Sequence, residues 1–181
     1  DLINTLLNIS RIELGSLVVQ LKEENFCAMI QNFLHDLEPA ILEKQIILKI
    51  TCPKEDKFLL IDKKLFQIIF INLMSNAIRY SHKGGLIEVE CLDVEKDQEI
   101  GGKFLPDDYF ITSIKDAGCG IPDKQKEKIF TKFFRADNAR VQDPNGNGLG
   151  LYMVKSIISY LNGYIWFLSQ ENKGTTFYIA I

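Results

Sequence analysis

The sequence lacks the patterns that mark several common classes of protein. It contains two histidines, and its four cysteines (Cys27, Cys52, Cys91 and Cys119) form no Cys-x-x-Cys pair, so no zinc site is predicted. No run of about 18 apolar residues occurs, so neither a membrane-spanning helix nor direct membrane contact is predicted. With a net charge of −3 and a pI near 5.5, the chain is not expected to bind nucleic acid. Unpaired, scattered thiols favour a reducing compartment, and we expect the cytoplasm.

What is present is enough apolar material for one sizeable core. Of the 181 residues, 46% are hydrophobic and 25% are charged, which is the balance of an ordinary globular domain. Residues 1–14 place Leu2, Leu6, Ile9 and Ile12 at helical spacing before Gly15. The apolar stripe of this helix needs a partner. We therefore interpret residues 1–15 as the end of a neighbouring element and residues 16–181 as the main domain.

Hydrophobic periodicity predicts both helices and strands in the main domain. Helices are expected at residues 25–44, 62–80, 123–134 and 148–161, and strands at residues 46–51, 57–61, 86–92, 109–115, 164–169 and 175–181. Pro39 should kink or interrupt the first helix, Asp62 should cap the N-terminus of the second, and a polar turn should join the first two strands. Residues 136–145 lack periodicity, which predicts a mobile loop. The order of elements favours a two-layer α/β sandwich, with helices on one face of a mixed sheet.

The predicted helix at residues 62–80 is apolar almost all round, yet it carries three polar side chains on one face. Asn72, Asn76 and Arg79 occupy positions i, i+4 and i+7, so they project together. Asparagine is a mediocre helix former and is costly to bury unpaired. Alone, the pattern fits a solvated polar stripe. It also fits a phosphate and metal site, because amide oxygens ligate hard cations and a guanidinium pairs with phosphate oxygens.

Three segments that contain glycine follow this helix. Asp116 ends a predicted strand in DAGCGIP, where its carboxylate could accept a hydrogen bond from an exocyclic amine, and the glycines would let a flat ring approach the backbone. GNGLG at residues 146–150 opens a helix, whose free N–H groups favour anions. GTTF at residues 174–177 enters the last strand. Each segment alone fits an ordinary glycine turn, and neither a P-loop nor a dinucleotide fingerprint is present.

In this order, the segments resemble the nucleotide-binding domain of sensor histidine kinases. These kinases belong to the GHKL group (Bergerat fold), which includes gyrase-type, heat-shock chaperone and mismatch-repair ATPases. NLMSNAIRY resembles the N box, IFTKFFR the F box, and DAGCGI, GNGLGL and GTTF the glycine boxes. The resemblance covers roughly residues 20–181. Residues 1–15 resemble the end of the second helix of a dimerisation and phosphoacceptor domain.

The resemblance implies that ATP and Mg²⁺ bind and gives individual residues a role. Asn76, with Asn72 beside it, would hold magnesium and the phosphates. Arg79 would contact phosphate, and Arg135 would reach the γ-phosphate. Asp116 would accept a hydrogen bond from the adenine amino group. The remaining residues of these boxes would shape the adenine pocket and the hinge of a mobile ATP lid: Tyr80, Gly118, Gly120, Ile121, Phe133, Gly146, Gly148, Leu149, Gly150 and Thr176.

The resemblance also implies a reaction and partners. Hydrolytic relatives carry a glutamate at the first N-box position, whereas this chain has Asn72, and an amide cannot act as a general base. We therefore expect transfer of the γ-phosphoryl group to a histidine, which depends on positioning and charge neutralisation. The implied partners are the protein's own dimerisation and phosphoacceptor domain, within a homodimer, and the receiver domain of a response regulator in a two-component system.

We expect the acceptor histidine to lie outside this sequence. His35 in HDLEPA is followed by proline after four residues rather than five, and Glu38 stands where a basic residue is usual. His35 also precedes Asn72 by only 37 residues (72 − 35), which is too short for an acceptor helix pair. His82 lies in a polar turn.

Two alternatives to a histidine kinase stay open at this point. One is a serine kinase of the same fold, such as an anti-sigma-factor kinase, but such kinases lack the dimerisation-like segment 1–15. The other is a non-catalytic nucleotide-binding module, which the intact Asn76, Asp116 and glycine boxes argue against.

Overall fold

The structure is a computed structural model that describes residues 2–181, apart from the side chain of Leu2. The parts of the first predicted helix that fall on Asp1 and on the Leu2 side chain lie outside the described residues. The helices are α1 (Leu2–Glu13), α2 (Phe26–Glu43), α3 (Lys63–Tyr80), η1 (Asp123–Lys128, a 3₁₀ helix), α4 (Asp137–Gln142) and α5 (Gly150–Tyr160). The strands are β1 (Lys22–Asn25), β2 (Ile47–Thr51), β3 (Phe58–Ile61), β4 (Leu86–Val94), β5 (Glu99–Ile100), β6 (Lys103–Phe104), β7 (Tyr109–Asp116), β8 (Tyr164–Gln170) and β9 (Gly174–Ala180).

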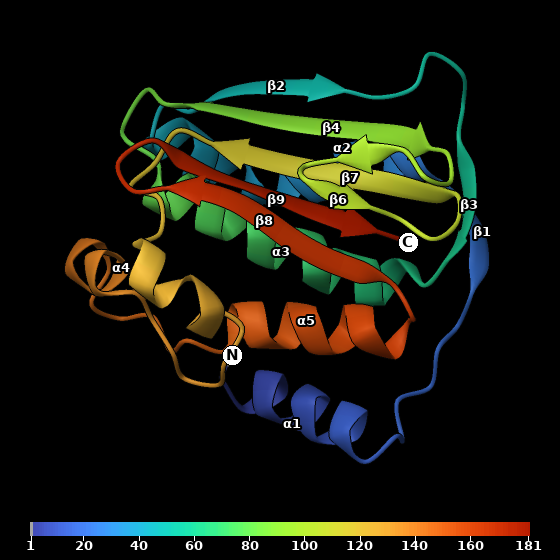
Figure 1. The fold of residues 1–181 in the computed structure, drawn as a ribbon, viewed down its shortest axis with the longest axis horizontal. Helices are drawn as coiled ribbons and strands as arrows, with labels where there is room; N and C mark the ends of the chain where they lie inside the picture. Colours follow the sequence, from blue (N-terminus) through green and yellow to red (C-terminus); the bar gives the residue numbers. More distant parts are fainter. Residues whose placement is uncertain (1) are drawn as a thin grey trace.

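Figure 1 shows a twisted sheet with the long helices gathered on one side of it, which confirms the predicted α/β sandwich. The sheet has the strand order β2-β4-β7-β9-β8. It is mixed, because β2 runs parallel to β4 while the other neighbours are antiparallel. A polar segment joins β2 to β3, as predicted, but these two strands do not pair with each other. The chain leaves the sheet after β2, and β3 pairs with β1, a polar strand whose sequence KEEN shows no apolar alternation.

α3 is the buried centre of the helical layer. It contacts α2, α5 and β7, and eight of its residues are buried. Asp62 caps its N-terminus as predicted, because the side chain accepts hydrogen bonds from the backbone N–H groups of Lys64 and Leu65 at 3.0 and 3.1 Å. Burial on three sides leaves one polar face, near the C-terminal end of the helix. The fold thus presents that face beside the end of β7.

Three local predictions are wrong. α2 is not interrupted at Pro39; the missing N–H leaves only the carbonyl of His35, an exposed residue, without its helical donor. The helix expected at residues 123–134 is the shorter 3₁₀ helix η1. Residues 136–145, expected to be an irregular loop, contain α4; six residues are too few to show helical periodicity.

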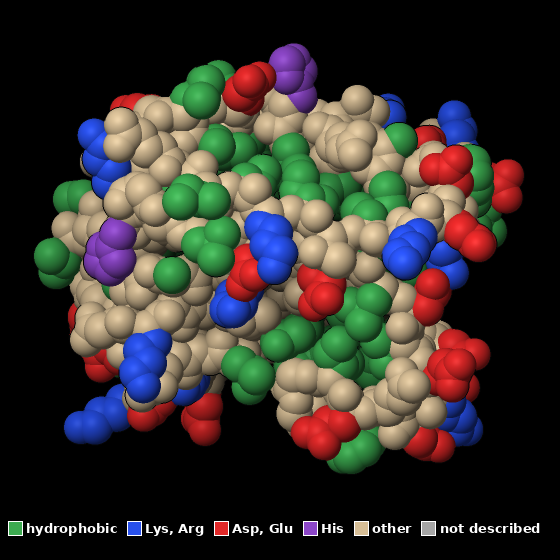
Figure 2. All heavy atoms as spheres, turned by 90° about the horizontal axis from the view of Figure 1, so that it is seen from above, with side chains coloured by type: hydrophobic (Ala, Val, Ile, Leu, Met, Phe, Trp, Pro, Cys, Tyr) green, Lys and Arg blue, Asp and Glu red, His purple; other side chains and the backbone are tan. Residues whose placement is uncertain are grey.

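The other face of the sheet is partly covered by a hairpin of β5 and β6, which the sequence analysis did not predict. The carbonyl of Gly101, in the turn between β5 and β6, accepts a hydrogen bond from the indole of Trp166 at 3.2 Å. Figure 2 views the molecule from the side of β2 and shows exposed hydrophobic side chains among charged ones. Ile47 and Ile50 of β2 are 61% and 40% exposed, in keeping with an edge strand. Between residues 2 and 181, none of the helices has the length and apolar character needed to cross a membrane.

Candidate nucleotide-binding site

A pocket of about 360 Å³ opens where α3, the end of β7, β9 and the start of α5 meet. Eleven of the predicted site residues line it: Asn72, Asn76, Arg79, Tyr80, Asp116, Gly120, Ile121, Arg135, Gly146, Gly148 and Gly150. These residues come from segments that lie far apart in the sequence. The fold therefore brings the N box, both glycine-rich turns and the end of the F box to one cavity of a size that small-molecule ligands occupy.

α3 supplies the amide groups of the pocket. The Nδ2 group of Asn72 donates to the carbonyl of Ile68 at 2.7 Å, which turns Oδ1 towards the start of α5. A Cβ atom on Gly150 would lie 2.7 Å from this oxygen, so a side chain at this position would displace the amide of Asn72. Asn76 lies one turn further along α3 and also lines the pocket. The predicted polar face of the helix is thus aimed into the cavity.

Asp116 is the one carboxylate among the residues that line this pocket, and it is only 8% exposed. Its Oδ1 atom accepts hydrogen bonds from the backbone N–H groups of Gly118 at 2.8 Å and Thr175 at 3.3 Å. Burial raises the pKa of the carboxyl from 3.8 to about 6, although the two N–H donors oppose the shift. The carboxylate is therefore held rigidly, with Oδ2 available to a ligand.

The glycines after Asp116 allow close backbone contacts. A Cβ atom on Gly118 would collide with the carbonyl of Tyr80, and Gly118 forms a β-bridge with Ser81. Gly120 has a φ of +62°, in the left-handed region that favours glycine. The side chain of Asn138 in α4 donates to the carbonyls of Cys119 and Gly120 at 3.3 and 2.9 Å. This turn therefore joins the end of α3 to the segment above the pocket.

Arg135 binds backbone rather than projecting freely into the pocket. Its guanidinium, 11% exposed, donates to the carbonyls of Ala139, Pro144 and Gly146 at 3.1, 3.2 and 2.9 Å, and also to that of Asp143. We call residues 136–149 the lid. In this structure Arg135 holds the lid in shape, and its contact with a γ-phosphate stays a prediction.

Four predicted binding residues do not line the pocket. The side chain of Thr176 lies on the opposite face of the sheet, where it borders a separate depression, and Thr175 takes its place in the pocket. Phe133 is 60% exposed and Phe134 lines the pocket instead. Leu149 is fully buried in the core, and Gly118 contributes the backbone approach described above.

The missed residue Thr175 had a signal in the sequence. Side chains alternate across a strand, and Phe177 is apolar and faces the helices, so Thr175 must share its face. For Asn138 and Asp143 no such signal existed, because their positions depend on how the lid folds.

α1 also reaches the site, since Thr5 lines the pocket. At the end of α1, Glu13 accepts a hydrogen bond from the phenol of Tyr152 in α5 at 2.6 Å and forms an ion pair with Lys132 at 2.6 Å. Hydrogen bonds from Lys132 and Tyr152 lower the pKa of Glu13. The phenol of Tyr160 donates to the carbonyl of Leu17 at 2.9 Å. The contacts of Glu13 dock the first predicted element against the second, and that of Tyr160 fixes the segment that follows α1.

The residues present fit a magnesium ion that arrives with a phosphate chain. Among residues 2–181, no cluster of three or more His, Cys, Asp or Glu side chains is arranged to hold a metal ion. Asn72 and Asn76 offer neutral oxygen ligands, the kind that Mg²⁺ accepts when phosphates and water complete its shell. The negative charge at such a site would come from the nucleotide.

Comparison with known proteins agrees with this geometry. Residues 61–181 match the family described as histidine kinase-, DNA gyrase B-, and HSP90-like ATPase. The sensor histidine kinase WalK of Bacillus subtilis is 37% identical over 124 residues, 68% of this chain and 19% of the relative. The sensor histidine kinase GacS of Pseudomonas protegens is 30% identical over 181 residues, 99% of this chain and 19% of the relative.

Solved structures show the same architecture. The catalytic domain of the histidine kinase ThkA has a TM-score of 0.72 and 27% identity, and the match covers 90% of this chain and 95% of that domain. ThkA in complex with the response regulator protein TrrA has the same fold at 24% identity and a TM-score of 0.72, over 99% of this chain and 47% of that one. This chain spans about a fifth of the length of WalK and GacS. It belongs to the histidine kinase-, DNA gyrase B- and HSP90-like ATPase family, as a catalytic domain of the sensor histidine kinase type.

Proposed function

We propose that this chain binds ATP with Mg²⁺ and transfers the γ-phosphoryl group to a histidine outside residues 1–181. The observation that carries the proposal is the convergence of four separate sequence segments on one pocket of about 360 Å³. That pocket combines a buried carboxylate, the two asparagine amides of α3 and two guanidinium groups. These are the groups needed to select an adenine ring and to hold a charged phosphate chain.

Asp116 is the proposed adenine selector. Both backbone donors in the described chain bind Oδ1, which leaves Oδ2 to accept a hydrogen bond from the exocyclic amine. The flat ring would lie against the backbone of Gly120 and the side chains of Ile121 and Thr175. Tyr80 borders the same cavity. A base with a carbonyl at the position of the amine would place two acceptors together, so guanine should be rejected.

The phosphate chain would meet Asn72, Asn76 and Arg79. Magnesium, when bound, supplies charge neutralisation between the phosphates. The two asparagine oxygens would hold the metal, while Arg79 would pair with phosphate oxygens. The start of α5 at Gly150 adds backbone N–H groups that favour anions. These contacts position the γ-phosphoryl group for attack by an incoming nucleophile.

One feature favours transfer over hydrolysis, and a second indicates that the acceptor lies elsewhere. The residue at the first N-box position is Asn72, whose amide donates to Ile68 and cannot take a proton from water. His35 is no competing acceptor, because its side chain is 82% exposed on α2 and does not line the pocket. The chain therefore has a site for the donor and needs an acceptor from another domain.

We propose residues 1–15 as the end of the second helix of a dimerisation and phosphoacceptor domain, and residues 16–181 as the catalytic domain. The alignment with GacS covers 99% of the chain, whereas the catalytic domain of ThkA covers 90% of it, which supports a short element outside the catalytic domain. The expected partners are that domain, in a homodimer of the full protein, and the receiver domain of a response regulator; ThkA has been solved with such a regulator. We place the reaction in the cytoplasm, where ATP is supplied.

The proposal is tested by phosphoryl transfer in two parts. The chain is mixed with labelled ATP and magnesium, alone and with a separate dimerisation fragment of its own full-length protein. Alone, it should bind nucleotide, hydrolyse it very slowly and gain no label. With the fragment, it should label the fragment's histidine with an acid-labile, alkali-stable group. Transfer should be slower than in the intact kinase, because the covalent tether raises the effective concentration.

Two variants complete this experiment. Asn76→Ala should abolish transfer while the domain stays folded, whereas His35→Ala should transfer as the unchanged chain does. An acid-stable product would favour a serine kinase instead. Label on His35 itself would show that HDLEPA holds the acceptor.

A further inference from the structure

One carboxylate oxygen of the lid lies between the two guanidinium groups of the pocket. Oδ2 of Asp143 is 2.8 Å from Nη1 of Arg79 and 3.8 Å from Nη2 of Arg135. Both arginines line the pocket, and the Asp143 side chain is only 19% exposed. The contact joins residues 64 positions apart in the chain. It therefore closes the lid against the end of α3.

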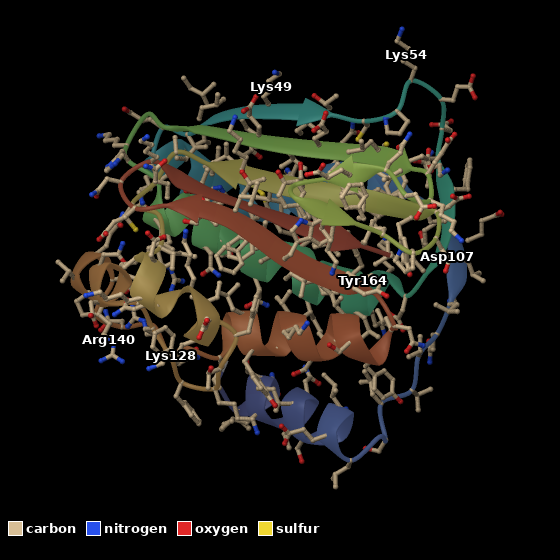
Figure 3. The ribbon with its side chains drawn as sticks, in the orientation of Figure 1. Lys49, Lys54, Asp107, Lys128, Arg140 and Tyr164 are labelled. Atoms are coloured by element: carbon tan, nitrogen blue, oxygen red, sulfur yellow. The ribbon has the colours of Figure 1, made fainter. Side chains whose placement is uncertain are left out.

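This position of Asp143 is fixed by further bonds. Its Oδ1 accepts a hydrogen bond from the backbone N–H of Asn145 at 3.1 Å, and its carbonyl accepts from Arg135. The neighbouring Gln142 donates to the carbonyl of Arg79 at 3.2 Å. Arg79 is thus bound to the lid through both its side chain and its backbone. By contrast, Arg140, which is exposed on the outer side of α4 (Figure 3), makes no such contact with α3.

A guanidinium binds carboxylate and phosphate oxygens through the same donors. Asp143 binds the guanidinium of Arg79, which is the group that would contact a phosphate chain. A phosphate that approached Arg79 would therefore compete with Asp143 for the same N–H groups. A ligand without phosphate would not compete.

We propose that Asp143 is a built-in competitor of the nucleotide's phosphate chain: its carboxylate binds Arg79 until phosphate oxygens displace it, which releases this part of the lid. The inference rests on the proposed binding of adenine nucleotides. In this proposal the lid also tunes affinity. Asp143 lowers the affinity for ligands that carry phosphate and leaves the affinity for the nucleoside unchanged. Displacement would also tie the position of the lid to the presence of a phosphate chain.

The test compares ligands that differ only in phosphate. Calorimetry measures the binding of adenosine and of ADP with magnesium to the unchanged chain and to Asp143→Asn. The asparagine keeps Oδ1 for the N–H of Asn145 but removes the charge. We expect ADP to bind about two- to fivefold more tightly to the variant, the range of a partly exposed ion pair, and adenosine to bind equally. Asp137→Asn, which removes a lid carboxylate bonded to Gln125, should change neither.

A second comparison isolates the pair itself. Arg79→Gln should weaken the binding of ADP, and adding Asp143→Asn to it should cause no further change, because the competing partner is already gone. If Asp143→Asn raised the affinities for adenosine and ADP equally, the lid would merely have loosened and the proposal would be wrong. An unchanged ADP affinity in Asp143→Asn would also overturn it. So would an equal rise in ADP affinity in Asp137→Asn, because that would indicate a long-range charge effect. If the unchanged chain bound no adenine ligand at all, the proposed function would fail instead.

Discussion

The buried carboxylate of Asp116, the proposed acceptor for adenine, destabilises the fold at neutral pH. Its pKa is higher in the folded chain than in the unfolded chain, so the folded state holds the proton more tightly. Stability therefore falls as the pH rises from 3.8 to about 6, and the whole destabilisation is present above that pH. The energy involved is about 1–3 kcal/mol.

Asp116→Asn should separate stability from binding. The amide oxygen can still accept from Gly118 and Thr175, so at neutral pH we expect unfolding to be unchanged or harder by up to about 3 kcal/mol. The amide N–H₂ would face the adenine amine, and ATP affinity should fall by roughly ten- to a hundredfold. Denaturant unfolding and calorimetry measure the two effects. A variant that binds ATP as tightly as the unchanged chain would refute the adenine assignment.

The same carboxyl predicts a pH dependence of binding. Only the ionised form is a full acceptor, and its pKa is about 6. ATP affinity should therefore be constant above that pH and should fall by up to tenfold per pH unit below it. The nearby Cys119 thiol stays neutral through this range, because burial and the charge of Asp116 raise its pKa. Asp116→Asn should lose the pH dependence, and a profile identical in both proteins would assign it to another group.

Cys119 offers a chemical probe of the same turn. It lines the pocket, and its raised pKa predicts slow alkylation at neutral pH, because the thiolate is the reactive form. We expect alkylation to speed up as the pH rises, to be slowed by ATP and to block nucleotide binding once complete. Mass spectrometry of the labelled peptide follows the reaction. Full ATP affinity after labelling of Cys119 would mean that the ring does not approach this turn.

At the scale of elements, Arg135 is the residue that most directly holds the lid. Arg135→Gln removes donors to four lid carbonyls, so the lid should open more often while the core stays intact. Trypsin should then cut after the exposed Arg140 faster than in the unchanged chain, with little change in thermal unfolding. Lys128→Gln, at an exposed position of η1 (Figure 3), serves as the control and should leave this cut unchanged. Equal rates in all three proteins would contradict the role of Arg135.

Some elements were readable from the sequence because one local rule decided them. The polar row of α3 followed from helical spacing alone, and the cap at Asp62 from its residue type. The lid could not be predicted, because α4 is held by bonds from Asn138 to the distant backbone of Cys119 and Gly120 and from Arg135 to the lid carbonyls, rather than by its own apolar face. β1 was missed for a similar reason: its residues are polar, and only pairing with β3 makes it a strand. Thr176 was predicted in place of Thr175 because the alternation of side chains along β9 was assigned to the wrong face of the sheet.

At the scale of the molecule, the docking of α1 can be tested through Glu13. Glu13→Gln keeps a weaker acceptor for Tyr152 but removes the ion pair with Lys132. We expect amide hydrogens in residues 2–13 to exchange faster, because α1 is held to α5 mainly along one face. Glu43→Gln, at the exposed end of α2, is the matched control. Unchanged exchange in Glu13→Gln would show that apolar packing alone fixes α1.

α5 takes part both in the nucleotide pocket and in the docking of α1. It begins at Gly150 against the oxygen of Asn72, and Tyr152, two residues later, is bonded to α1. If the docking of α1 changes the affinity for ATP by some factor, the binding of ATP must change the docking equilibrium of α1 by the same factor. The two equilibria share one thermodynamic cycle. If the two equilibria are coupled, a nucleotide bound in this pocket would act on α1, and any change in the docking of α1 would act on the nucleotide.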